Sequence, residues 1–152
     1  MEQQEASGDA VMTRIGQAVM LLHGGDREEA RNRFGALWSE IGETGDALHR
    51  CTLAHYMADT QDEPGDELAW DLRALAAADS LTAEGAPGLA VRAFYPALHA
   101  GLAADYLKLQ RPGAARAHLD RAHESMAALG DDGYGDGVRC AVARLERALG
   151  DA

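Results

Sequence analysis

The fold of this chain is decided by two stretches, AVMLLHGGDREEARNRFGAL at residues 18–37 and AADYLKLQRPGAARAHLDRA at residues 103–122. In each, a small residue is followed three positions later by a large one and then by a tight turn: Ala18 with Leu21, and Ala103 with Tyr106. After the turn, an alanine is followed four and seven positions later by further apolar residues. Small residues let two antiparallel helices approach, and large ones fill the space beside the next pair. The pattern predicts repeated helical hairpins.

The same helical spacing of apolar residues recurs along the whole chain, and strand-like alternation is absent. We therefore expect an all-α fold of about seven helices in a single domain over residues 1–152. The expected parts are three stacked antiparallel hairpins, at about residues 9–42, 46–80 and 88–129, and a C-terminal capping helix at about residues 138–149.

Three local features sharpen this prediction. Asp26 with Glu29 three positions later has the pattern of a capping box and predicts a helix start. Pro96 lies inside a long helical pattern, so it should either kink that helix or mark its true start. Between Asp59 and Asp71 six acids occur without a base, which predicts a solvated loop or a docking place for a basic partner.

Composition limits the function. The formal net charge of −11 and 14 scattered basic residues argue against a nucleic-acid partner. No apolar run approaches the roughly 20 residues that span a bilayer, and the acidic N-terminus does not have the pattern of a signal peptide. Two cysteines that form no CxxC pair favour a reducing compartment. We expect a cytoplasmic protein without a membrane partner.

With these residues in view, the sequence resembles the tetratricopeptide repeat family over about residues 10–128. The matching residues are Ala103, Tyr106, Ala115, Leu119 and Ala122 in the third hairpin, and Ala54, Leu68, Leu72 and Leu75 in the middle one. The family's first-helix tryptophan is replaced by Arg14, Arg50 and His99, and its first-helix glycine by alanine. Successive hairpins are roughly 40 to 45 residues apart instead of 34. Similar alanine-rich repeat proteins are frequent in GC-rich bacteria, usually as regulatory or adaptor modules.

The resemblance implies a right-handed superhelix whose first helices line a concave groove that binds a peptide or protein segment. Carried over to this sequence, the groove residues are Met12, Ile15, Val19, His23, Cys51, His55, Asp59, Ala100, Ala104, Leu107 and Lys108. A non-enzymatic adaptor or regulatory module without a cofactor or metal is the expected function. A rival interpretation is that the N-terminal segment or the helix at residues 138–149 fills the groove of its own chain. Self-association is also open.

The alternative is a small-molecule or metal-binding protein, or an enzyme. Cys51, His55 and Asp59 recur every four residues on one helix face, so one further ligand, from His23 or His99, would complete a metal site. A nearby His55 could also activate the Cys51 thiol, with Tyr95 close by. Two other motifs fail: HESMA has Ala127 where a zinc protease needs its second histidine, and DDGYGDG lacks the closing glutamate of a calcium loop.

Overall fold

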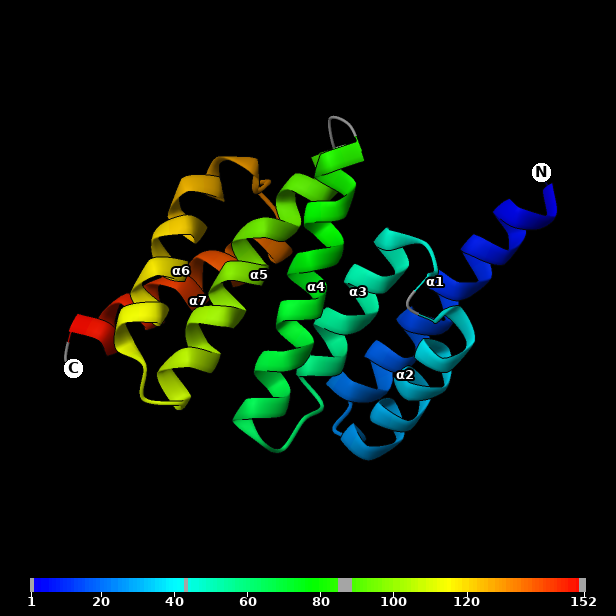
Figure 1. The fold of residues 1–152 in the computed structure, drawn as a ribbon, viewed down its shortest axis with the longest axis horizontal. Coiled ribbons are helices and arrows are strands. Elements are labelled where there is room, and N and C mark those ends of the chain that lie inside the picture. Colours follow the sequence, from blue (N-terminus) through cyan, green and yellow to red (C-terminus); the bar gives the residue numbers. More distant parts are fainter. Residues whose placement is uncertain (1, 43, 85–88, 151–152) are drawn as a thin grey trace. The chain divides into compact units, whose positions relative to one another are not determined.

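The computed structural model describes residues 2–42, 44–84 and 89–150, and within them it is all-helical, with seven α-helices and no strand (Figure 1). The helices are α1 (Glu2–His23), α2 (Arg27–Ile41), α3 (Ala47–Ala58), α4 (Pro64–Glu84), α5 (Leu89–Lys108), α6 (Pro112–Ser125) and α7 (Gly133–Gly150). A short 3₁₀ turn, η1 (Met126–Ala128), follows α6. The predicted all-α class with seven helices is confirmed. None of the described helices is long and apolar enough to cross a membrane.

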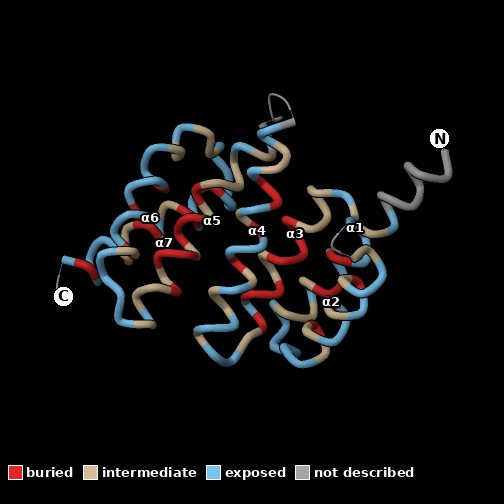
Figure 2. The backbone as a smooth tube through the Cα atoms, viewed as in Figure 1, coloured by how far each residue is buried: buried red, intermediate tan, exposed pale blue. Residues whose placement is uncertain are grey.

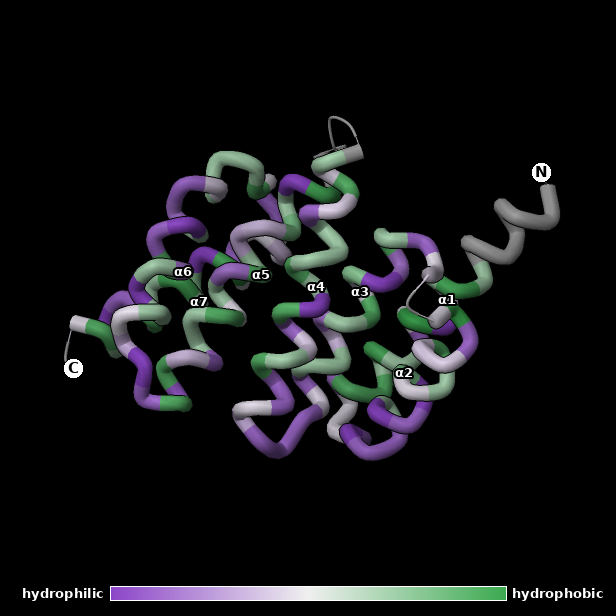
Figure 3. Tube along the Cα trace, viewed as in Figure 1, coloured by the Kyte–Doolittle hydropathy of each residue, from purple (hydrophilic) through white to green (hydrophobic). Residues whose placement is uncertain are grey.

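The chain divides into two compact units. The N-terminal unit, Met1–Ala77, contains α1, α2, α3 and most of α4; the C-terminal unit, Ala78–Ala152, contains the end of α4 with α5, α6, η1 and α7. Along most helices, hydrophobic and hydrophilic stretches alternate (Figure 3), and buried stretches occur in the helices of both units (Figure 2). Each unit therefore has its own core, and the single domain expected over residues 1–152 stays a prediction.

In the N-terminal unit, α1 packs on α2, and both contact α3. The core residues are Ile15, Ala18, Ala30, Phe34, Leu37, Leu53 and Met57. Ala18 and Ala30 are fully buried. Because their side chains are small, the two helices of the hairpin can lie close together. Phe34 fills the space beside them and stacks on Tyr56 of α3, with ring centroids 6.3 Å apart.

In the C-terminal unit, α5 packs on α6, and α7 contacts both. The core residues are Ala100, Ala103, Ala115, Leu119, Ala122, Val138, Val142 and Leu149. The last helix thus contributes three residues to this core. This helix begins at Gly133, five residues before the expected capping helix at residues 138–149, and its role as a cap of a repeat stays a prediction.

The two units share one internal pattern with a constant separation of 85 residues. Each of the seven core residues named above for the N-terminal unit corresponds, 85 positions later, to a core residue named for the C-terminal unit. The pairs are Ile15 with Ala100, Ala18 with Ala103, Ala30 with Ala115, Phe34 with Leu119, Leu37 with Ala122, Leu53 with Val138, and Met57 with Val142. Helices α1, α2 and α3 therefore correspond to α5, α6 and α7. The repeat predicted for the hairpins extends to a third helix.

Both hairpins also make the same turn. After α1, the Asp26 amide donates to the Leu21 carbonyl at 2.9 Å, and the Gly25 amide donates to Leu22 at 3.1 Å. After α5, the amides of Arg111 and Gln110 repeat these two bonds to Tyr106 and Leu107, at 2.8 and 3.0 Å. This is a Schellman motif, which needs one residue in the left-handed region. That residue is Gly25, with φ +93°, in one turn and Gln110, with φ +60°, in the other.

The difference between these turns predicts a stability change. Glutamine in the left-handed region is strained relative to glycine, so Gln110→Gly is expected to raise the free energy of unfolding by roughly 0.5–1 kcal/mol. Gly25→Gln should lower it by a similar amount, because no atom crowds a Cβ at Gly25 and only the backbone is strained. Urea denaturation followed by circular dichroism measures both. Equal stability of the two variants and the parent would contradict this account of the turns.

Three local expectations differ from the structure. Asp26 is the N-cap residue of α2, but its side chain accepts no capping hydrogen bond, and Glu29 pairs with Arg33 at 3.1 Å, so the capping box is wrong. Pro96 is buried inside α5, so of the two expectations for this residue the helix start is wrong, and the kink stays a prediction. Helix α4 begins at Pro64, so half of the acidic stretch lies on a helix. Proline suits this first position, and Asp66 and Glu67 favour the positive end of the helix dipole.

Candidate functional site

The predicted stripe on α3 runs from the core to the solvent. Asp46 caps the helix by accepting hydrogen bonds from the amides of Leu48 and His49, at 2.9 and 3.2 Å. Cys51 is only 1% exposed, His55 is half-buried, and Asp59 is exposed at the C-cap position. Helical spacing places the three residues on one face of α3. Only Asp59 is exposed, however, so the three side chains do not form one accessible surface.

The surroundings of His55 favour its neutral imidazole form. Burial lowers the pKa of His55, and the charge of Asp59 opposes this shift only in part. The buried Asp71 is close to this ring, with its Oδ1 3.9 Å from His55 Nδ1. That distance is longer than a hydrogen bond, and an ion pair would need the protonated ring that burial disfavours. The pair therefore contributes little charge stabilisation near neutral pH.

The metal alternative needs side chains that converge on one point. Across residues 2–42, 44–84 and 89–150, no group of three or more His, Cys, Asp or Glu side chains lies close enough to hold one metal ion. The two residues considered as further ligands have other surroundings: His23 is exposed at the end of α1, and His99 forms a hydrogen bond with His118. Among the described residues, the side chains of the α3 stripe are therefore not part of a group that could hold a metal ion.

The predicted groove residues on α1 separate into a core side and a surface side. Ile15 is 2% exposed and belongs to the core. Val19 is half-buried beside that core, whereas Met12 and His23 are exposed. Met20, which the sequence analysis left out, is 75% exposed. The solvent side of α1 therefore has two exposed methionines next to a partly buried valine.

The predicted groove residues on α5 also differ in how far they are exposed to solvent. Ala100 is buried in the core that α7 completes, so in this structure it does not line a surface. Ala104 and Leu107 are half-buried, and Lys108 is exposed at the end of the helix. The last helix thus covers the first helix of its hairpin at Ala100.

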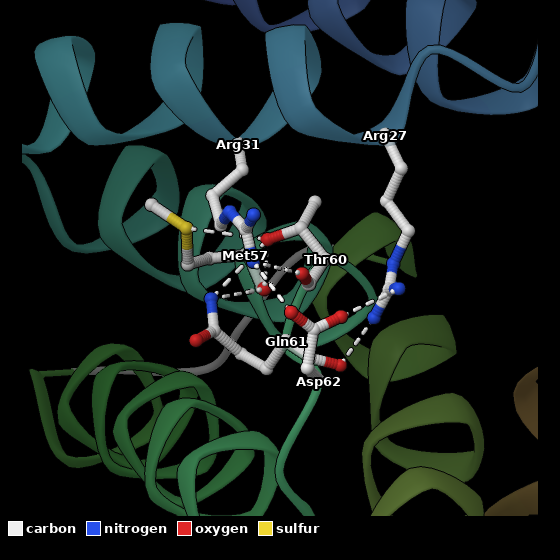
Figure 4. A network of polar contacts seen from close by, with 6 residues as sticks. All are labelled: Arg27, Arg31, Met57, Thr60, Gln61 and Asp62. Atoms are coloured by element: carbon white, nitrogen blue, oxygen red, sulfur yellow. Dashed lines mark hydrogen bonds and ion pairs between the residues drawn. The ribbon is translucent and has the colours of Figure 1, made fainter.

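Sequence reasoning missed a cluster that fixes the acidic stretch to α2 (Figure 4). Asp62 pairs with Arg27 at 2.8 Å and with Arg31 at 3.3 Å. Arg31 also donates to the Thr60 carbonyl at 3.2 Å, and Arg27 donates to that of Gln61. The hydrogen bond from Arg31 is the main cause that lowers the pKa of Asp62. Part of the acidic charge is therefore neutralised within the unit, which leaves less of it for a basic partner.

A column of four rings in the C-terminal unit was also missed. Tyr95, His99, His118 and Tyr106 stack in that order, with ring centroids 6.2, 5.3 and 5.5 Å apart. The Nδ1 atoms of the two histidines are 3.0 Å apart, so one ring donates and the other accepts. Burial, then the neighbouring His118, lowers the pKa of His99 to about 4; burial also lowers the pKa of His118. Helical spacing could have placed each of the four residues on a face of its own helix. It could not have shown which rings of α5 and α6 stack on each other.

A hollow of about 250 Å³ lies at the α1–α2 hairpin and is lined by Arg14, Gln17, Arg33, Ala36 and Leu37. The Arg14 guanidinium turns to Glu40, with an N–O distance of 2.6 Å, and that of Arg33 turns to Glu29 at 3.1 Å. Two guanidinium groups and an amide can donate hydrogen bonds to an anionic group, above a floor that is apolar at Leu37. None of the lining residues was a predicted site residue.

No protein-family model, no curated protein and no solved structure matches this chain.

Proposed function

We propose that this protein is a non-enzymatic binding module, similar to tetratricopeptide repeat adaptors, that recognises a protein or peptide segment in the cytoplasm. The observation that carries the proposal is the exposed apolar side of α1. Four large hydrophobic residues are strongly exposed in the described part of the chain: Met12, Met20, Leu72 and Tyr134. Two of them are on this one helix, 39% and 75% exposed.

The helix periodicity places these side chains together. Met12, Gly16, Val19 and His23 follow one line along α1, and Met20 lies beside that line. Isolated exposed apolar residues are ordinary, but Met12 and Met20, about two turns apart on one side of α1 with the partly buried Val19 beside them, give a partner two apolar contact points, called here the methionine strip. Methionine side chains are flexible and polarisable, and they are frequent on surfaces that accept several partners.

The chemistry of the expected partner follows from this strip and from the charge of the chain. An amphipathic helix could place its apolar face on Met12 and Met20 while His23 meets its polar edge. The net charge of −11 favours a neutral or basic segment over an acidic one. The groove residues that the proposal uses are therefore the exposed ones on α1, because Ile15, Cys51 and Ala100 are buried.

The proposal is tested with a charge placed on the strip. In affinity capture from the source cell, the double variant Met12→Asp/Met20→Asp is expected to lose at least 90% of the specifically retained partner, because each new carboxylate must be desolvated at the contact. The matched control is Asn32→Asp/Ser39→Asp, which adds similar charge at exposed positions of α2. Circular dichroism checks that both variants fold. Equal retention by the two variants would contradict the proposal.

A further inference from the structure

The hollow at Arg14 and Arg33 has a counterpart in the C-terminal unit, and the counterpart is covered. By the 85-residue correspondence, Arg14 matches His99, Arg33 matches His118, and Gln17 matches Leu102. His99 is 7% exposed and Leu102 is fully buried. The side chains of Arg14 and Arg33 are 48% and 52% exposed, and Gln17 is also exposed. The same place on the repeated fold is therefore covered in one unit and open in the other.

Part of the cover in the C-terminal unit is the end of a helix. The last turns of α4, from Ala78 onward, belong to this unit. The Tyr95 hydroxyl donates to the Asp79 carboxylate at 3.0 Å and lies 2.8 Å from the Thr82 hydroxyl. The charge of Asp79 acts on His99, whose pKa it raises against the effect of burial. At this site, the end of α4 places one carboxylate on the Tyr95 hydroxyl, beside His99 in the ring column.

The side chains that replace the histidine pair explain why the hollow is open. One imidazole can donate to the other, so His99 and His118 approach to 3.0 Å and close the space between α5 and α6. Two guanidinium groups have only donors and repel each other, so Arg14 and Arg33 turn apart to Glu40 and Glu29. A carboxylate that enters between them would accept charge-assisted hydrogen bonds from both, whereas Asp79 of α4 accepts only from the neutral Tyr95 hydroxyl next to His99.

We propose that this face of the α1–α2 hairpin docks an α-helix of a partner protein, one with small residues on its contact side and a carboxylate that enters the hollow between Arg14 and Arg33. The argument is independent of the methionine strip, because the hollow is lined by residues on another side of α1. The precedent for the occupant is the end of α4, and its charge is complementary to the two guanidinium groups.

A synthetic peptide with the sequence of residues 68–84, acetylated and amidated, is the probe, because it carries the covering segment with Asp79. Added at up to millimolar concentration to the ¹⁵N-labelled full chain, it is expected to shift amide signals of α1 and α2. The dissociation constant should rise about tenfold in the chain variant Arg14→Met/Arg33→Met, and about fivefold for the peptide variant Asp79→Asn. The control Arg144→Met/Arg147→Met removes the same charge from exposed positions of α7 and should leave binding unchanged.

Several results would overturn the proposal. They are no binding of the peptide at millimolar concentration, equal binding by the Arg14→Met/Arg33→Met variant and the control, or amide shifts confined to other helices. Sedimentation adds one more: if the full chain dimerises and Arg14→Met/Arg33→Met abolishes the dimer, the occupant is a second copy and not a separate partner. Loss of the proposed adaptor function in the methionine variants leaves this test unaffected, since those variants retain both arginines.

Discussion

Phe34→Ala is expected to lower the free energy of unfolding of the N-terminal unit by about 3–5 kcal/mol, the usual cost of emptying a large aromatic site in a core. Phe34 is fully buried, and it connects the α1–α2 hairpin to α3 through its stack on Tyr56. Neighbouring alanines at positions 18 and 30 have no side-chain freedom with which to fill the cavity. Most of the lost volume therefore remains as a void.

Fluorescence makes this measurement specific to one unit. Both tryptophans of the chain, Trp38 and Trp70, lie in the N-terminal unit, with ring centroids 5.0 Å apart. Urea denaturation followed by tryptophan emission should therefore show the full loss for Phe34→Ala. Phe34→Leu introduces the residue that the C-terminal unit has at position 119, and it should cost only about 1 kcal/mol. A loss below about 1 kcal/mol for Phe34→Ala would mean that this site is not the centre of the core.

Acidification from pH 6.5 to pH 4 is expected to remove about 2–3 kcal/mol of stability through the ring column of the C-terminal unit. The pKa of His99 is lowered from 6.5 to about 4 in the folded chain. In the unfolded chain His99 therefore binds a proton below about pH 6.5, whereas in the folded chain it binds one only near pH 4. Stability is fully present above pH 6.5 and is lost as the pH falls through this window, and the lowered pKa of His118 adds to the loss.

Thermal denaturation by circular dichroism across this pH range measures the slope. Carboxylates also titrate there, so the informative quantity is the difference between the parent and His99→Gln, which keeps a hydrogen-bonding group but cannot be protonated. His99→Gln should flatten the pH dependence, whereas His23→Gln, at the exposed end of α1, should leave it as in the parent. Parallel pH curves for the parent and His99→Gln would show that the column does not resist protonation.

Much of the fold could be predicted because apolar spacing carries the information for helices. The pattern at Ala18 and Ala103 predicted that these alanines lie in the core, and both are buried there, since small residues let two helix backbones come close. The third helix of the repeat escaped notice because Leu53 and Val138, like Met57 and Val142, are alike only in being apolar. Helix starts were less predictable, as at Pro64, because a first helical turn depends on capping contacts more than on apolar spacing.

The candidate sites were harder to predict from the sequence than the helices. Spacing on α3 placed Cys51, His55 and Asp59 on one face, but it could not show how deep each side chain lies, because depth depends on the packing of the neighbouring helices. The hollow depends on the directions of Arg14 and Arg33, which Glu40 and Glu29 fix, and Glu40 is 26 residues from Arg14. The ring column likewise needs α5 and α6 to meet at one register. Such sites arise from tertiary contacts that no local pattern encodes.

The shared register of the two cores has a practical consequence for protein engineering. Because all seven positions recur with one constant offset, residues 10–58 and 95–143 are two alternative sequences for the same three-helix module. Chimeras that exchange single helices between the modules, such as α3 for residues 132–143, which include the first part of α7, should keep a packed interior. The chain thus supplies two templates for building longer arrays whose outer surfaces can be chosen freely.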